Sequence, residues 1–117
     1  MSGPDDGERS LTTDTCLMLL ANAHRRGVLL SLCDRGAENA EQIPVEETVP
    51  DSLSTRTEVA LTHQHLPKLA HHDVIRWDRE NQTVGPGPAF GAIEPFVSSL
   101  DAVRKRLPDD WQSGLDR

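Results

Sequence analysis

Apolar residues recur at helical spacing in two neighbouring segments near the start of the chain. Asn22 suits the position that caps the second of these helices, which we expect to run from about residue 23 to residue 33. The same spacing predicts that Arg25 and Arg26 point outward to solvent. The apolar residues of the two segments are Cys16, Leu17, Leu19 and Leu20 in the first and Val28, Leu29 and Leu32 in the second.

A third helical pattern occupies about residues 54–70, after a connector over residues 37–53 that shows no sustained period. Ser54 supplies a hydroxyl that can cap this helix. Pro67 removes one backbone hydrogen bond, at a cost of about 3 kcal/mol in an ideal helix, so we expect a kink or a restart at residues 66–67. The apolar positions of the third helix are Val59, Leu61, Leu66 and Leu69.

The pattern then changes to alternation, which predicts a β-hairpin. Residues 74–78 alternate in polarity, residues 79–82 form the turn, and residues 83–84 begin a return strand. The following Gly-Pro-Gly-Pro run over residues 85–88 should end the hairpin.

A last helix is predicted over residues 88–108, with apolar residues spaced alternately four and three apart. Pro95 is expected in the first turn of its main part, and Pro108 ends it. A stripe this apolar needs a partner surface, either the chain's own domain or the matching helix of a second copy. We favour a homodimer through Ile93, Phe96, Leu100, Val103 and Leu107.

Length and composition limit the fold to one small, mainly helical domain. The chain has 117 residues with 36% hydrophobic and 3% aromatic residues, so its core is built from Leu, Val, Ile and Ala. We therefore expect a mainly α fold with a small β-hairpin over residues 11–87, an added C-terminal helix over 88–108, a disordered N-terminus over 1–10 and a flexible tail over 109–117. No run approaches the roughly 18–20 apolar residues of a membrane span, and the polar, acidic N-terminus lacks a signal-peptide pattern, which indicates a cytoplasmic protein.

The charge of the chain bears on the salt concentration in which the protein works and on the kind of partner it binds. The formal net charge is −7, and only two of its 12 basic residues are lysines. An acidic, lysine-poor surface favours a protein from a halophile, where molar salt screens like-charge repulsion; an ordinary acidic protein is the alternative. Residues 34–53 contain six acids and one base, whereas residues 54–84 contain four of each together with four histidines. The second segment is therefore the one that best tolerates an anionic partner.

The predicted order of helix, helix, acidic connector, helix and hairpin is that of a winged helix-turn-helix. Residues 17–29, LMLLANAHRRGVL, resemble the L-x-N-x-x-R-R-x-x-L opening of small haloarchaeal winged-helix proteins assigned mainly to a domain of unknown function. Residues 61–75, LTHQHLPKLAHHDVI, are similar to their H-L-P-K-L-x-x-x-x-V-I signature, which is related to the recognition helix of arsenic-repressor-type and MarR-type regulators. The resemblance covers residues 15–85. Family members often have Ala-Gly before the valine of the wing, where this chain has His72 and Asp73.

The resemblance implies a DNA-binding transcriptional regulator whose third helix enters the major groove and whose hairpin contacts phosphates or the minor groove. Gln64 suits adenine and Arg56 suits guanine, whereas Thr57 and Lys68 suit phosphates. The negative net charge weakens nonspecific affinity for DNA, so the alternative is a protein–protein interaction module on the same fold. The candidate DNA-binding residues are Arg56, Thr57, His63, Gln64, Lys68, Arg76 and Arg79.

The residue pattern gives little support to metal binding or catalysis. His63 and His65 point about 200° apart on a helix, so they cannot chelate one ion within a chain, and there is no Cys-x-x-Cys motif. No glycine-rich phosphate loop and no nucleophile with an evident base are present. We therefore expect no cofactor, no metal and no enzymatic activity.

Overall fold

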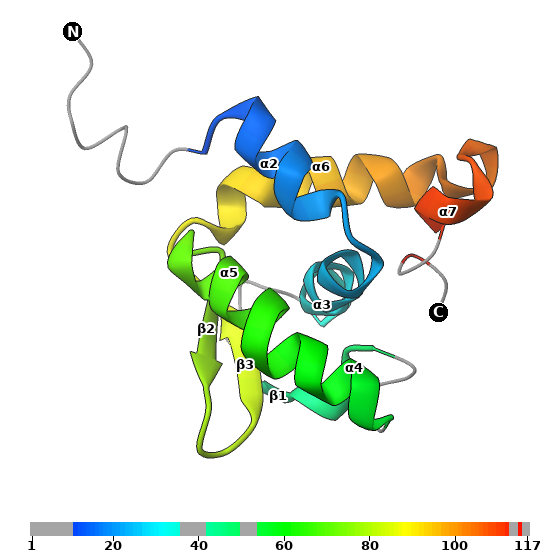
Figure 1. The fold of residues 1–117 in the computed structure, drawn as a ribbon. Coiled ribbons are helices and arrows are strands. Elements are labelled where there is room, and N and C mark those ends of the chain that lie inside the picture. The colour runs from blue at the N-terminus through cyan, green and yellow to red at the C-terminus, as the bar shows by residue number, and fades with distance from the viewer. Residues whose placement is uncertain (1–10, 36–41, 50–53, 113–114, 116–117) are drawn as a thin grey trace, which may run out of the picture.

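The computed structural model describes residues 11–35, 42–49, 54–112 and 115, and it is mainly helical with a small three-stranded antiparallel sheet (Figure 1). The α-helices are α2 (Thr13–Leu20), α3 (Ala23–Asp34), α4 (Thr55–Ala60), α5 (Leu66–His71), α6 (Phe90–Ala102) and α7 (Asp109–Gln112). Two 3₁₀ turns, η2 (Val45–Glu47) and η4 (Arg104–Arg106), and one π-helical turn, η3 (Leu61–His65), complete the helical elements. The strands are β1 (Ile43–Pro44), β2 (Ile75–Asp78) and β3 (Thr83–Pro86).

Polar side chains cap the first two helices, and the cap of the second one, Asn22, is the residue that the sequence predicts. The Thr12 hydroxyl accepts a hydrogen bond from the Thr15 amide at 3.0 Å. The Asn22 side chain accepts from the amides of His24 and Arg25, so it satisfies two of the amides that a helix N-terminus leaves without partners. The predicted boundary between α2 and α3 is confirmed. Gly36, which we expect to end α3, lies outside the described residues.

The acidic connector contributes a strand to the sheet. Ile43 pairs with Val84, both side chains are buried, and the strand order is β1-β3-β2. The Val45 amide donates to the Gln82 carbonyl at 2.9 Å, which ties the connector to the hairpin turn. The predicted hairpin of β2 and β3 is thus present, and β1 adds a third strand to the sheet. The hairpin is expected over residues 74–85, and β3 extends one residue further, to Pro86, because Pro86 still pairs with Ile75.

The third predicted helix is a continuous helical segment that changes its pitch. Ser54 caps α4 through a 3.2 Å bond from the Thr57 amide. The Leu66 amide then donates to the Leu61 carbonyl, five residues back, which defines the π turn. α5 restarts at Leu66 with Pro67 in its first turn, where the missing amide costs least. At residues 66–67, where the sequence predicts a kink or a restart, the hydrogen bonding changes from π to α while the backbone stays helical.

The end of α5 has a Schellman geometry. The Val74 amide donates to the Leu69 carbonyl, and the Asp73 amide donates to the Ala70 carbonyl. This arrangement requires a left-handed residue, and Asp73 adopts φ 63°. Asp73 therefore occupies the conformation that a glycine adopts without strain. Gly87 passes so close to this turn that a Cβ would collide with the backbone of Asp73 and Ile75.

α2 and α6 lie side by side on one side of α3, and α4 to α5 lie on its other side (Figure 1). Ile93 and Val97 of α6 are fully buried in the common core. Ile93 is therefore part of the chain's own core, which corrects its predicted place in a dimer seam. Phe96, Leu100 and Leu107 are partly buried against the same core, while Val103 is 39% exposed.

The C-terminal region differs from its predicted outline in three ways. α6 ends at Ala102 instead of residue 108, and η4 follows it. Pro95 lies in the interior of α6 instead of its first turn. The region expected to be a flexible tail begins with α7, and Leu115 is fully buried. Residues 1–10 lie outside the described part. Within that part, no helix combines the length and apolarity needed to cross a membrane.

Candidate nucleic-acid interface

The helical segment from α4 to α5 has one face in the core and one in solvent. Thr57, Leu61, His65 and Leu69 are buried at intervals of four residues. In an α-helix each fourth residue is rotated by about 40° around the helix axis relative to the previous one. The π turn has more residues per turn, so it rotates less per residue and keeps these four residues closer to one face. The opposite face, which we call the outward stripe, consists of Arg56, Val59, Ala60, His63, Gln64, Pro67, Lys68 and His71.

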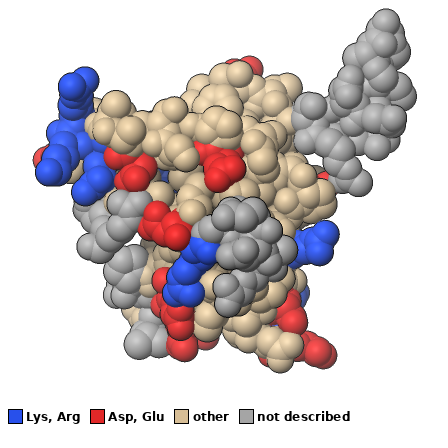
Figure 2. All heavy atoms as spheres, turned by 180° about the vertical axis from the view of Figure 1, so that it is seen from behind, with Lys and Arg blue, Asp and Glu red and all other residues tan. Residues whose placement is uncertain are grey.

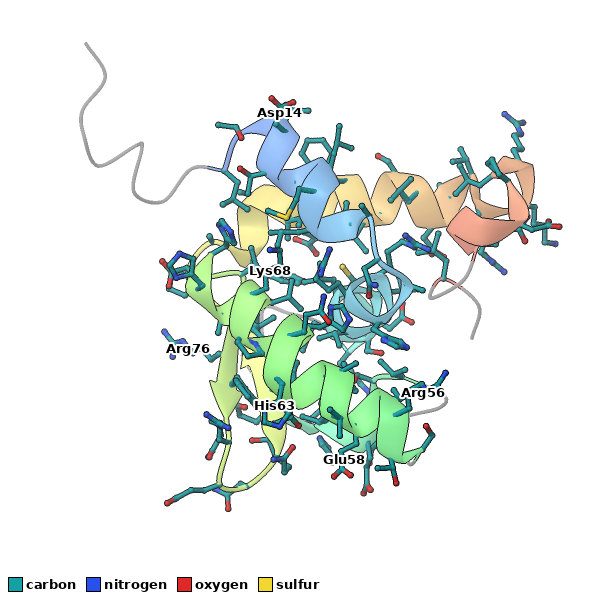
Figure 3. All side chains as sticks on the ribbon, viewed as in Figure 1. Asp14, Arg56, Glu58, His63, Lys68 and Arg76 are labelled. Atoms are coloured by element: carbon teal, nitrogen blue, oxygen red, sulfur yellow. The ribbon has the colours of Figure 1, made fainter. Side chains whose placement is uncertain are left out.

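The outward stripe contains no acidic residue. Arg56, His63 and Gln64 are exposed, and Lys68 is partly exposed near the end of the stripe. Figure 3 shows Arg56, His63 and Lys68 spaced along this segment from its start to its end. Four of the seven predicted DNA-binding residues therefore share one surface.

Two positions on this helix differ from their predicted roles. Thr57 is only 4% exposed, so it packs inside and cannot contact a phosphate; its amide donates to the capping Ser54. Val59, predicted to be in the core, is 51% exposed on the outward stripe. The spacing of Val59, three residues after Arg56 and four before His63, is the sequence signal that places it on their face.

The hairpin carries the two remaining candidates beside the helix. Arg76 is exposed on β2, and Arg79 is exposed in the turn, where its guanidinium lies 5.0 Å from the centre of the Trp77 ring. Asp78 accepts hydrogen bonds from the side chain and the amide of Asn81, and these bonds lower the pKa of its carboxyl. The Asp78 carboxylate thus holds the turn through Asn81. Arg76 and Arg79 are the two basic residues of the hairpin, and both are exposed.

Arg25 and Arg26 are buried, contrary to the predicted outward position. Arg25 Nε donates to the Leu19 carbonyl at 2.8 Å, and Arg26 donates to the Leu20 carbonyl at 2.7 Å. These carbonyls belong to the C-terminus of α2, where a helix lacks internal partners and its dipole favours a cation. The paired arginines of the sequence motif thus join α2 to α3, and their role is structural.

Arg25 also connects this junction to the buried face of η3. Its Nη1 lies 3.0 Å from His65 Nδ1, and His65 faces away from His63 and Gln64 into the core. Burial, and after it the charge of Arg25, lowers the pKa of His65 to about 4. His65 is therefore neutral at pH 7, and its Nδ1 can accept a hydrogen bond from the Arg25 guanidinium. This bond ties the π turn to the α2–α3 junction.

Acidic residues lie beside and behind the outward stripe. Glu58 is exposed on the flank of α4, and in Figure 3 it points away from Arg56. Figure 2 shows Asp and Glu spread over the opposite face of the molecule, with the densest group of Lys and Arg at one corner. The outward stripe itself thus contains no acidic residue, while acidic side chains lie on its flank and on the face shown in Figure 2.

The histidines form two pairs. The rings of His24 and His65 are 5.4 Å apart, and those of His71 and His72 are 5.3 Å apart, both edge to face. His63 is exposed and His65 is buried, so the two do not face one site. Among the described residues, no group of three or more His, Cys, Asp or Glu side chains could hold a metal ion.

Comparison with known proteins gives a family but no characterised relative. No curated protein and no solved structure matches the chain. A family model matches residues 17–85, which run from α2 to β3 and leave α6 outside. Since this segment is more than half of the sequence, the chain belongs to the family described as Domain of unknown function (DUF7344).

Proposed function

We propose that this protein is a DNA-binding transcriptional regulator of the winged helix-turn-helix type. The segment from α4 to α5 serves as the recognition helix, and the hairpin of β2 and β3 serves as the wing. The observation that carries the proposal is the outward stripe: in a chain with a net charge of −7, a solvent-exposed helical face has two bases, two histidines, a glutamine and no acid.

Four side chains of the stripe have a matching group on DNA. Arg56 can bond guanine and Gln64 can bond adenine, in each case with two hydrogen bonds, while Lys68 pairs with a phosphate. Val59, exposed between Arg56 and His63, provides the apolar surface that the methyl group of thymine contacts in the major groove.

The acidic flank favours a second candidate, a protein–protein interaction module on the same fold. Glu58 borders the stripe and Glu80 lies at the hairpin tip, and both would repel a phosphate backbone at low salt. Molar salt, as in a halophile, screens this repulsion but also suppresses counterion release, so base contacts would have to supply more of the affinity.

The test begins by selecting bound fragments from a random DNA pool and measuring their affinity at several KCl concentrations. The two lysines provide a matched pair: Lys68 lies on the stripe, and Lys105 lies in η4. We expect Lys68→Ala to weaken all sequences alike and to reduce the salt slope by about one unit, while Lys105→Ala has no effect.

The Gln64→Ala variant tests base readout. It should cost about 1–3 kcal/mol on the selected site and little on unrelated DNA. Equal affinities for the parent, Lys68→Ala and Gln64→Ala would reject the stripe as a DNA surface. Failure to select any DNA would leave the interaction module as the better description.

A further inference from the structure

The guanidinium of Arg25 joins three helical elements at one buried point. Arg25 lies near the start of α3 and is only 7% exposed. Its Nε donates to the Leu19 carbonyl at 2.8 Å and its Nη2 to the Met18 carbonyl at 3.1 Å, both in α2. Its Nη1 lies 3.0 Å from Nδ1 of His65 in η3, 40 residues away in the sequence. Because the guanidinium is a rigid planar fork, the two carbonyls of α2 fix the direction of the N–H that meets His65.

His65 is held on the inner side of η3 by two neighbouring residues of α3. Besides its contact with Arg25, its ring packs edge to face on the ring of His24, with the centroids 5.4 Å apart. The amides of His24 and Arg25 both donate to the Asn22 side chain, which fixes the start of α3. Burial lowers the pKa of His65 to about 4, so at pH 7 the ring is neutral and its Nδ1 remains an acceptor.

The directions of the two preceding side chains follow from the place of His65. His63 and Gln64 are exposed on the outward stripe, whereas His65 is buried. Successive residues of an α-helix are rotated by about 100° around the axis, and residues of a π turn by less. Once His65 faces α3, the directions of His63 and Gln64 are therefore set.

The π turn itself depends on this contact. The turn is defined by the bond from the Leu66 amide to the Leu61 carbonyl, and such turns are rare. In a regular α turn His65 would be rotated further around the axis and away from Arg25, which would leave a buried guanidinium N–H without its acceptor. The bond between Arg25 and His65 thus favours the π turn over the α turn.

We propose that Arg25 is a positioning residue for the outward stripe. Through its bond to His65 it sets the directions of His63 and Gln64. This role rests on the DNA-binding function proposed above, and it makes Arg25 a determinant of base specificity that does not itself touch DNA. Arg25 is then more than a link between α2 and α3.

The first test uses NMR on the ¹⁵N-labelled full chain without DNA. In the parent, the ¹⁵N shift of His65 Nδ1 at pH 7 should be that of an unprotonated nitrogen. His65→Leu removes the acceptor, whereas His65→Asn keeps a side-chain oxygen at the position of Nδ1. Residual dipolar couplings of the His63 and Gln64 amides report the orientation of their N–H bonds. We expect these couplings to change in His65→Leu and to stay near the parent values in His65→Asn.

The second test measures sequence preference on the DNA site selected for the parent. Arg25→Lys keeps the charge at the end of α2, but an ammonium cannot reproduce the planar fork that bonds both carbonyls and His65. Arg25→Lys and His65→Leu should lose at least about fivefold of the preference for this site over sites with one base changed, while their affinity for unrelated DNA changes less than about twofold. His65→Asn should recover the preference to within about twofold of the parent.

Asn22→Ala is the matched control, because the Asn22 side chain bonds amides of its own helix, whereas Arg25 also reaches η3. It should lower the melting temperature and leave both the couplings and the sequence preference unchanged. If His65→Leu does not fold, Arg25→Lys and His65→Asn decide the question.

Four results would overturn the positioning role: a protonated Nδ1 in the parent, unchanged couplings in Arg25→Lys, a loss of preference in Asn22→Ala equal to that in Arg25→Lys, or a His65→Asn variant that has lost the preference. Failure of the parent to select any DNA would reject the DNA-binding function and the specificity role with it. Unchanged couplings in an Arg25→Lys variant of a chain that does select DNA would reject the positioning role alone.

Discussion

Replacing Asp73 by glycine should stabilise the protein, because Asp73 closes α5 with φ 63°. A left-handed backbone costs an L-residue about 1–2 kcal/mol, with aspartate at the low end because its short side chain can bond locally. Glycine avoids this cost but loses more conformational entropy on folding, by about 0.5–1 kcal/mol relative to alanine. The balance gives Asp73→Gly a net gain of roughly 0.5 kcal/mol.

Asp73→Ala is the informative control, since it also removes the carboxylate but keeps a Cβ. The Schellman bonds of Val74 and Asp73 hold the turn in place, so alanine must adopt the same strained backbone. We expect the two variants to differ by about 1 kcal/mol, which corresponds to about 4–8 °C in melting temperature for a domain of roughly this size. Thermal and urea unfolding followed by circular dichroism measure the difference. Equal stability of the glycine and alanine variants would refute the strain at this position.

Further predictions concern packing, pH, salt and assembly. Gly87→Ala should destabilise by about 1–3 kcal/mol through collision with backbone, whereas Gly91→Ala, with open space around it, should be neutral or stabilising in urea titrations. The pKa of His65 is lowered to about 4 in the folded chain, so the unfolded chain binds more protons between pH 6.5 and 4. Stability should therefore fall by up to about 3 kcal/mol as the pH is lowered through that window, and it should fall less in His65→Gln. The melting temperature should rise as KCl approaches molar concentrations, and a flat or falling value would contradict the halophile hypothesis. If the chain forms a dimer through the end of α6, Val103→Glu should yield a monomer by light scattering; a parent that is already monomeric at tens of micromolar would remove the dimer.

Features set by local chemistry could be predicted from the sequence. Asn22 and Ser54 cap helices because their side chains reach amides two or three residues away, and Pro67 marks the restart because it lacks an amide. The alternation of apolar and polar residues over 74–78, followed by turn residues, likewise predicted the hairpin from neighbouring positions. None of these depends on contacts between distant parts of the chain.

Features set by contacts between different elements could not be predicted in this way. Arg25 and Arg26 bond carbonyls of the preceding helix, six residues back, because the chain turns between α2 and α3, and a helical pattern alone places them in solvent. β1 has two residues, and only its pairing with β3 makes it a strand. On the candidate site, Thr57 is buried and Val59 is exposed, because which face of α4 packs on the core depends on how the helix sits against the other elements. Four of the seven candidates still lie on one face.

The π turn also has a consequence for how this surface can evolve. A single inserted residue in an α-helix can be absorbed as one wide turn, so that the segments before and after it keep their packing. Deleting one residue from η3 would accordingly restore a regular helix while α4 and α5 stay seated on the core. His63 and Gln64, the exposed members of η3, lie where such a change in length is taken up. Relatives that differ by one residue here could therefore present a different set of outward side chains on an unchanged scaffold.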